Sequence, residues 1–499
     1  MSKEEVLRHI LRGMQTMHVG IVGAGPAGLT AADALVQKGH TVTVFEQDAR
    51  YVGGISRTVE YKGYRFDIGG HRFFSKNPDI EEYWTEVLQD DFLVRPRLSR
   101  IFYGGKFFDY PLKAGNAFLN MGLGNTMMCL VDYLRSRIAP RKPVLTFEDW
   151  VTNQFGARLF RMFFQTYTEK VWGIPCDEIS ADWAAQRIKG LNLATAVLSA
   201  VRPQRSSGSE TVIKTLIDRF RYPKLGPGML WERIAQRVVE AGGTLNMGMK
   251  IVRIEKMAAG GYRLQGSGQD ASLTVEVDQL ISSMPLRSLV RALHPAPPPA
   301  VVQSANALRY RDFLTVALMI DQPDLFPDNW IYIHDPSVKV GRIQNFKNWS
   351  PDMVPDARTT CLGLEYFCFE GDGLWNAEDA TLIALAAREV AAIGLLQGGT
   401  VFDGRVVRVP KAYPVYDDGY AHRVATIRNH LADHFPDLQV IGRNGMHRYN
   451  NQDHAMLTGL LAARNLDGGR YDLWAVNGDA EYLEELPEER LVPRSLAGA

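Results

Sequence analysis

The sequence HVGIVGAGPAGLTAADALVQKGHTVTVFE occupies residues 18–46. Its first five residues form a short apolar run typical of a buried strand, and the residues after Pro26 place apolar side chains at helical spacing as far as Gly39. The run TVTVFE that follows has the pattern of a second strand. This order of strand, helix and strand within about 30 residues predicts a βαβ unit with parallel strands.

Three glycines join the first strand to the helix: Gly23, Gly25 and Gly28. They serve a tight turn, close approach of the backbone to a pyrophosphate, and close packing of the helix on the strand. The helix N-terminus favours that anion. Glu46 ends the second strand, where a carboxylate can accept hydrogen bonds from an adenosine ribose. The sequence therefore predicts a dinucleotide-binding site.

Composition points to an ordinary globular protein with small-molecule ligands. The 499 residues include 56 Lys and Arg, 56 Asp and Glu, and 46% apolar residues, enough for two or three domains. Balanced charge without a basic block gives no indication of a nucleic-acid partner. The four cysteines suggest neither a metal site nor a disulfide framework, which favours a reducing compartment. With a charged N-terminus and no apolar run of membrane-spanning length, a cytoplasmic protein without a signal peptide or membrane span is expected.

The remaining chain alternates between strand-rich and helix-rich stretches. It predicts an α/β fold: a discontinuous Rossmann-like domain, an inserted helical domain, and an antiparallel β-sheet domain for the substrate. The predicted ranges are 17–80, 216–300 and 400–470 for the nucleotide-binding domain, 81–215 for the helical domain, 301–399 for the sheet domain, and 1–16 and 471–499 for terminal extensions.

A second glycine pair follows Glu46 in the segment GGISRT, residues 53–58. This segment resembles the extended fingerprint of the large FAD-binding family that includes the amine oxidases and the UDP-galactopyranose mutases. The resemblance implies that FAD is the cofactor. It also implies that Gly54, Ser56 and Arg57 join the first three glycines and Glu46 in binding it.

Four further segments resemble the UDP-galactopyranose mutases more than the amine oxidases or carotenoid desaturases. They are GYRFDIGGHRFFSKN at 63–77, YTEKVWGIPCDEISADWAAQR at 167–187, VGRIQNFKNWSPDMVP at 340–355, and IGRNGMHRYNNQDHAMLTGLLAARNL at 441–466. The second segment matches the mutase pattern at nearly every specified position and is the most specific of the four.

The mutase resemblance implies roles for individual residues. The flavin would lie against Gly70 and His71. The substrate diphosphate would be bound by Arg187 and Arg342. Arginine suits this role because its guanidinium binds phosphate through two hydrogen bonds. The nucleotide-sugar pocket would be lined by Tyr167, Trp172, Tyr413 and Tyr449. The closing flavin motif would contribute Gly442, Arg443 and Asp453.

The implied reaction is the interconversion of the pyranose and furanose forms of a nucleotide sugar. Reduced flavin would displace the nucleoside diphosphate from the anomeric carbon, so an electron donor is also implied. A desaturase or amine-oxidase type of oxidoreductase is the alternative, because one fold supports several chemistries. A non-catalytic FAD-binding protein is a third hypothesis, and the oligomeric state is left open.

Two residues depart from the mutase pattern. His447 stands where the family usually has tyrosine, and Asn451 stands where bacterial mutases carry an aspartate. Both departures fall in the expected pocket, so they leave the sugar and the reaction itself open. No residue identifies a uracil site, so the nucleobase is open as well.

Overall fold

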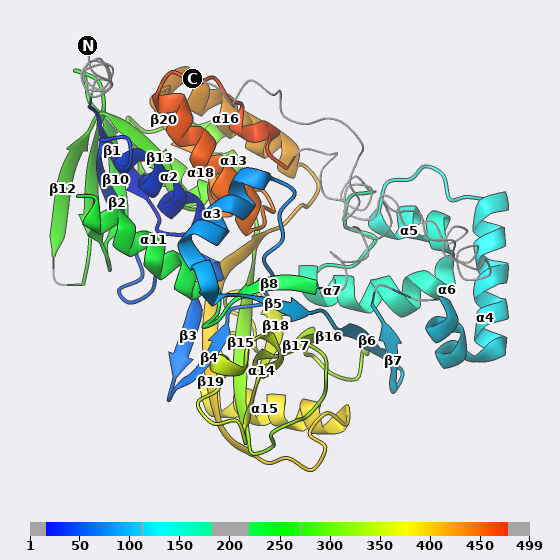
Figure 1. The fold of residues 1–499 in the computed structure, drawn as a ribbon. Coiled ribbons are helices and arrows are strands. Elements are labelled where there is room, and N and C mark those ends of the chain that lie inside the picture. Colours follow the sequence, from blue (N-terminus) through cyan, green and yellow to red (C-terminus); the bar gives the residue numbers. More distant parts are fainter. Residues whose placement is uncertain (1–15, 111, 113, 182–218, 270, 478–499) are drawn as a thin grey trace.

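A computed structural model describes residues 16–110, 112, 114–181, 219–269 and 271–477 (Figure 1). The predicted βαβ unit is confirmed as the centre of a parallel sheet. Helix α2 (Pro26–Val36) connects two adjacent strands of this sheet, which has the order β20-β13-β1-β2-β9. The strands are β1 (His18–Val22), β2 (Thr41–Phe45), β9 (Thr244–Asn246), β13 (Gln279–Ser282) and β20 (Leu438–Val440).

Helices from distant parts of the chain cover this sheet and share one apolar core with it. Gly459 explains how closely two of them approach, since a Cβ atom there would lie 2.3 Å from the carbonyl oxygen of Ala27 on α2. The helices of this region are α3 (Pro78–Leu88), α11 (Gly228–Glu240), α12 (Leu286–Ala292), α13 (Pro299–Ala307), α16 (Tyr420–His434), α17 (Gly442–Gly445) and α18 (Gln452–Leu466).

A four-stranded sheet packs beside the parallel sheet, in the order β12-β11-β10-β14. It is antiparallel except where β10 meets β14. Its strands are β10 (Lys250–Lys256), β11 (Tyr262–Ser267), β12 (Ser272–Val277) and β14 (Leu293–His294).

A seven-stranded sheet forms the second large unit, in the order β19-β15-β18-β17-β16-β6-β7. Its pairs are antiparallel apart from β6 and β16. The strands are β6 (Ser99–Tyr103), β7 (Lys106–Asp109), β15 (Tyr310–Ile320), β16 (Trp330–Ile333), β17 (Arg342–Asn345), β18 (Thr360–Cys368) and β19 (Val401–Pro414). Helices α14 (Phe346–Trp349) and α15 (Asp379–Ala392) accompany them.

The helical part projects away from the parallel sheet and lies at the right of Figure 1. It contains α4 (Ala114–Ile138), α5 (Phe147–Phe155), α6 (Ala157–Phe160) and α7 (Thr166–Trp172), with a π-helical turn at Arg161–Gln165. Helix α5 begins at a capping box in which Thr146 and Asp149 satisfy each other's backbone N–H groups.

Two strand pairs link these units: β3 (Thr58–Tyr61) with β4 (Tyr64–Asp67), and β5 (Phe92–Pro96) with β8 (Arg219–Pro223). No helix among the described residues is long and apolar enough to cross a membrane.

The predicted fold class is confirmed, but two predicted boundaries need correction. The range 81–215 was assigned to helices, yet β6 and β7 within it extend the seven-stranded sheet. The range 400–470 was assigned to the nucleotide-binding domain, yet β19 pairs with β15 along its length. In both cases the partner strand lies far away in the sequence, so local periodicity could not reveal the pairing.

Candidate active site

The turn between β1 and α2 has room for glycine alone at two positions. Gly23 has a φ of +101°, and a Cβ atom there would lie 2.3 Å from Oγ of Ser283. A Cβ atom at Gly28 would lie 1.9 Å from the carbonyl oxygen of Gly23. The first turn of α2 is therefore packed directly on the end of β1.

The N-terminus of α2 suits an anion. Gly25 occupies the N-cap without a side-chain cap, and the first turn holds no acidic residue. Gly54, in the turn Gly54–Ser56, comes so close that its Cβ atom would lie 3.4 Å from Cα of Gly25. Arg57 follows this turn and forms an ion pair with Asp48, with Nη1 and Oδ2 3.1 Å apart. The Nε atom of Arg57 is buried without a hydrogen bond. This bare helix end and the unsatisfied guanidinium atom fit the pyrophosphate of a dinucleotide.

Glu46 is fixed at the end of β2 by two backbone groups. Its carboxylate accepts hydrogen bonds from the N–H of Ala24 at 2.8 Å and of Asp48 at 2.9 Å. Burial raises the pKa of Glu46 above its ordinary value, although these two bonds act in the opposite direction. The side chain is thus held beside the glycine turn, at the position predicted for ribose contact.

The closing segment returns to the same helix end. Gly442 has a φ of +74°, and its Cβ atom would lie 3.0 Å from Cβ of Ala27. Asp453, in the first turn of α18, accepts a hydrogen bond from Oγ of Ser75 at 3.1 Å. Gly442 therefore contacts α2, and Asp453 contacts the loop after Gly70.

Arg443 contacts a pair of tyrosines. Tyr413 and Tyr449 stack with ring centroids 5.5 Å apart and an interplanar angle of 11°. The Arg443 guanidinium carbon lies 5.2 and 4.8 Å from these two centroids, and its nitrogens donate to the carbonyls of Ala412 and Asn450. Cation–π contact and backbone bonds together fix the tyrosine pair.

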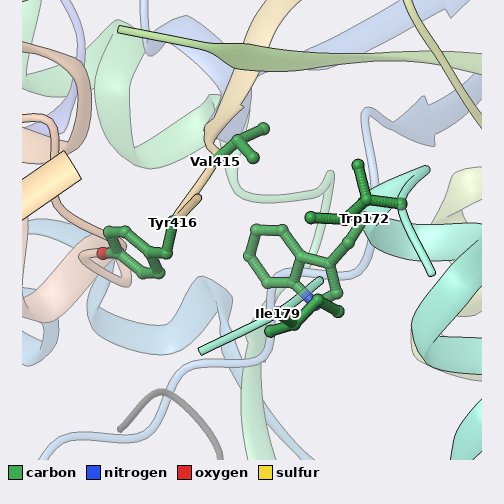
Figure 2. A pocket seen from close by; sticks show the side chains of 5 residues that line it. Trp172, Ile179, Val415 and Tyr416 are labelled. Carbon is green, nitrogen blue, oxygen red and sulfur yellow. The ribbon is translucent and has the colours of Figure 1, made fainter. Parts of the chain in front are cut away.

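Trp172, on α7, adds a third aromatic ring beside the tyrosine pair. Its ring centroid lies 6.3 Å from that of Tyr449 and 6.3 Å from that of Tyr416. Figure 2 shows the side chains of Trp172, Ile179, Val415 and Tyr416 around a narrow apolar gap. The Tyr416 hydroxyl also accepts a hydrogen bond from the N–H of Tyr449 at 2.6 Å.

Tyr167 lies on the same helix and stacks on His334, with centroids 4.8 Å apart and an interplanar angle of 7°. Its ring also meets the ring of Tyr332 edge-on at 5.4 Å. Lys170, one turn further along α7, donates to the carbonyls of Ile333, Asp335 and Val340. Helix α7 is thereby attached to the strand that carries Tyr332.

Arg342 forms a two-bond ion pair with Glu365. Its Nε and Nη2 atoms each lie 2.8 Å from one carboxylate oxygen, and Gln344 donates to the same carboxylate at 2.5 Å. The Glu365 side chain is 1% exposed. The Arg342 pKa is raised well above its ordinary value because Glu365 and two nearby tyrosines outweigh the effect of burial. Arg342 is therefore a fixed cation. Its Nε and Nη2 atoms bind Glu365, so Nη1 is the nitrogen that could bind a further anion.

His71 lies in the loop that faces this ion pair. A Cβ atom at Gly69 would lie 3.8 Å from Arg342 Nη2, from Glu365 Oε1 and from His71 Nε2. His71 Nε2 contacts the carbonyl oxygen of Ile68 at 2.9 Å, so Nε2 carries the proton. Burial lowers the pKa of His71 to about 4, and the charges of Arg443 and Arg342 act in the same direction. His71 is therefore neutral at pH 7.

The loop also packs closely on the sheet at Gly70. A Cβ atom added there would lie 2.9 Å from Oε1 of Gln344 on β17. The structure thus brings the predicted pocket residues into one cluster, although they come from five segments of the chain. The cluster contains His71, Tyr167, Trp172, Arg342, Tyr413, Arg443 and Tyr449. Arg187 lies outside the described residues.

Sequence reasoning missed Glu365, His334 and Tyr416. Glu365 is the one charged residue of β18, and a charge in a strand buried along its whole length is the signal that could have identified it. No comparable signal marks His334 or Tyr416.

The two departures from the mutase pattern have structural roles. His447 is buried edge-on to Tyr310 at 4.9 Å, and burial lowers its pKa to about 4. Asn451 is the N-cap of α18 and forms a capping box with His454. Neither residue belongs to the cluster around Arg342.

Comparison with known proteins identifies the family. The sequence model described as "Flavin containing amine oxidoreductase" matches residues 26–411, well over half of the chain. The chain belongs to this flavin-containing amine oxidoreductase family. Its members bind FAD, and the bare end of α2 and the Gly23–Gly28 turn fit that cofactor, so the chain is an FAD-binding flavoprotein.

Individual relatives of this flavoprotein differ in activity. It is 26% identical over 296 residues to 15-cis-phytoene desaturase of Synechococcus elongatus. The matched region covers 55% of this chain and 59% of the relative. It is 26% identical over 181 residues to a protein of Klebsiella pneumoniae named "Probable UDP-galactopyranose mutase", which covers 34% of this chain and 44% of the relative. The chain therefore spans about half the length of these curated relatives.

Among solved structures, reduced UDP-galactopyranose mutase is similar over 93% of this chain and 98% of its own. The TM-score is 0.78 and the sequence identity is 24%, a likeness that establishes a shared fold. The resemblance inferred from the sequence is thus confirmed at the level of the family and the fold.

Proposed function

We propose that this flavoprotein is a nucleotide-sugar mutase that interconverts pyranose and furanose forms. The observation that carries the proposal is the convergence of Arg342, the stacked Tyr413–Tyr449 pair and Trp172 beside neutral His71. Such a site combines a fixed cation with hydroxyl donors and aromatic surfaces. These are the groups that recognise a diphosphate and a sugar ring.

Each side chain would have a distinct part in binding. Arg342 would donate through Nη1 to a phosphate oxygen, held in place by Glu365 on its other edge. The hydroxyls of Tyr413 and Tyr449 would bind the second phosphate. The charge of Arg443 beside their rings favours such an anion.

His71 would act as a neutral group beside the sugar. The backbones of Ile68 and Ile55 both hydrogen-bond its ring, so His71 would offer the sugar a fixed, uncharged surface. When bound, reduced FAD supplies the nucleophile for the anomeric carbon, and the chain supplies orientation and charge.

An oxidoreductase of the desaturase or amine-oxidase type is the second candidate. One observation favours it: Glu365 already balances the charge of Arg342. A substrate without phosphate would need no further cation, and the rings of Trp172, Tyr413 and Tyr449 would offer it aromatic surface.

The test is an activity assay on the flavin-loaded protein reduced with dithionite without oxygen. UDP-galactopyranose and UDP-galactofuranose head a panel of nucleotide sugars, and the products are separated by chromatography. Isomer interconversion that disappears when the flavin is oxidised supports the proposal. Unchanged sugars, together with bleaching of the oxidised flavin by an amine or an apolar substrate, would support the oxidoreductase instead.

Two variants connect that assay to the site. Tyr413→Phe removes one proposed phosphate donor and should raise KM about tenfold with a smaller change in kcat. Tyr103→Phe, on β6 outside the cluster, is the matched control and should leave both constants unchanged.

A further inference from the structure

The last described segment of the chain, residues 472–477, is packed against the rest of the protein. The side chains of Leu473 and Val476 are buried, and Leu473 belongs to the same apolar core as the parallel sheet. Arg428 on α16 lies over the ring of Trp474, with its guanidinium carbon 5.1 Å from the ring centroid. Residues 472–477 are therefore a fixed part of the fold, and they are called the C-terminal clamp below.

The clamp is hydrogen-bonded to the loop that carries Tyr449. The side-chain amide of Asn477 donates to the carbonyl oxygen of Tyr449 at 3.0 Å and to Oδ1 of Asn450 at 3.1 Å. In the other direction, Arg448 donates to the carbonyl oxygens of Asn477, at 2.6 Å, and of Trp474. These four hydrogen bonds join residues that lie 26 to 29 positions apart in the sequence.

Side chains hold the backbone of Tyr449 on both sides. Its N–H donates to the hydroxyl of Tyr416 at 2.6 Å, and its carbonyl oxygen accepts the hydrogen bond from Asn477. Tyr449 lies between α17 and α18, outside any helix or strand. The two side chains therefore supply the hydrogen-bond partners that a regular element would otherwise provide.

The position of the Tyr449 ring follows from that of its backbone. The ring stacks on Tyr413 with centroids 5.5 Å apart, and the guanidinium carbon of Arg443 lies 4.8 Å from its centroid. A shift of about 1 Å in a group that binds substrate is enough to weaken its contacts strongly. The hydroxyl of Tyr449 is therefore placed by hydrogen bonds that are made outside the pocket.

The same amide also reaches the flavin side of the site. Asn450, which accepts from Asn477, is 1% exposed, and its Nδ2 atom lies 3.4 Å from the carbonyl oxygen of Gly442. Gly442 is the residue of the closing segment that packs on Ala27 of α2. Asn477 is thus connected to both ends of the loop between α17 and α18.

We infer that Asn477 is a positioning residue: from the C-terminal clamp it holds Tyr449 in the place where its hydroxyl can bind the substrate diphosphate. The inference rests on the proposed function for the identity of that substrate. Asn477 has a φ of +55°, a left-handed conformation that glycine adopts without strain. The variant Asn477→Gly therefore removes the amide and leaves the backbone free to keep its conformation.

The first test is hydrogen–deuterium exchange on the full chain with FAD bound and without substrate. Asn477→Gly should speed amide exchange in residues 443–452 at least about fivefold. Arg448→Met removes the other two hydrogen bonds and should have the same effect. Gln397→Gly is the matched control and should leave exchange in these residues unchanged. Gln397 also has an amide side chain and a left-handed φ, of +48°, but it is exposed in the turn after α15.

The second test measures the affinity for UDP by calorimetry on the same proteins. Asn477→Gly should weaken UDP binding about five- to tenfold, as expected for one misplaced hydrogen-bond donor. In the mutase assay KM should rise by a similar factor with kcat nearly unchanged, because Tyr449 would bind the diphosphate throughout the reaction. A general loss of folded protein would instead lower the apparent kcat and leave KM unchanged.

Two results would overturn the inference. One is exchange in residues 443–452 that is equally fast in Asn477→Gly and Gln397→Gly. The other is faster exchange in Asn477→Gly with unchanged affinity for UDP. A wild type that does not bind UDP would overturn the proposed function instead, and the exchange measurement would still decide whether Asn477 holds the Tyr449 loop.

Discussion

At the scale of single residues, the pocket depends on the ion pair between Arg342 and Glu365. Arg342→Met should lower the free energy of unfolding by about 3 kcal/mol, because it leaves a buried carboxylate without its cation. In Arg342→Met/Glu365→Gln most of that loss should be regained. Urea unfolding of the single and double variants measures both. Losses that simply add would mean that the two residues act independently.

The sequence predicts one member of this ion pair but not the other. The sequence predicted Arg342, His71, Trp172 and the tyrosines through the motifs around them, and the structure brings these residues together. Glu365 could not be placed as the partner of Arg342 from the sequence. Its position depends on the register between β17 and β18, which aligns Arg342 with Glu365 across 23 residues of sequence. Such registers follow from tertiary packing.

At the scale of elements, the junction of β1 and α2 is predicted to be intolerant of a single methyl group. Gly28→Ala would place that group 1.9 Å from a backbone oxygen, so the helix end must move away from the strand. The purified variant should lose most of its bound flavin, as measured by absorbance per chain. Gly373→Ala is the control, because nothing lies within 4 Å of its new methyl group. Full flavin content in Gly28→Ala would contradict the assignment of this junction to FAD.

Helix α7, which carries Tyr167 and Trp172, depends on a buried arginine at its C-terminus. Arg311 donates to the carbonyls of Lys170 and Val171 at the helix end and to that of Phe367 on β18. Arg311→Met leaves these carbonyls unsatisfied and should lower the free energy of unfolding by about 3 kcal/mol. Arg309→Met, two residues away and exposed, should change it by less than about 0.5 kcal/mol in the same urea titration. Equal effects would mean that Arg311 does not secure α7.

Element-level prediction succeeded where the signal was local. The βαβ unit follows from a continuous stretch of 29 residues, and both its strands and its helix lie where periodicity puts them. The hairpin of β6 and β7 was missed because each strand is short and pairs with a sheet assembled mostly from residues 310–414. Long-range pairing of this kind leaves little trace in local sequence.

At the scale of the whole molecule, buried histidines from three separate regions should make the protein sensitive to acid. Burial lowers the pKa of His71 to about 4, of His334 to about 3 and of His447 to about 4. In the unfolded chain these groups titrate near about 6.5. Between these values the unfolded state binds more protons than the folded state, so stability must fall as pH decreases from about 6.5 towards 4.

Buried carboxyl groups oppose this trend, because burial raises the pKa of Asp67, Glu46 and Glu232. Burial raises the pKa of Asp67 to about 8, so in the folded state it keeps a proton that the unfolded chain releases above about pH 4. Each buried histidine makes unfolding take up as much as one further proton, which lowers stability by about 1.4 kcal/mol per pH unit as pH falls from about 6.5 to 4.5, and the buried carboxyls reduce the resulting drop. Urea unfolding across this range measures the drop.

His334→Phe, which keeps an aromatic ring against Tyr167, should reduce the slope of stability against pH by about one proton. His422→Gln, on the exposed side of α16, should leave that slope unchanged. Parallel curves for His334→Phe and the wild type would show that His334 does not contribute to the acid sensitivity.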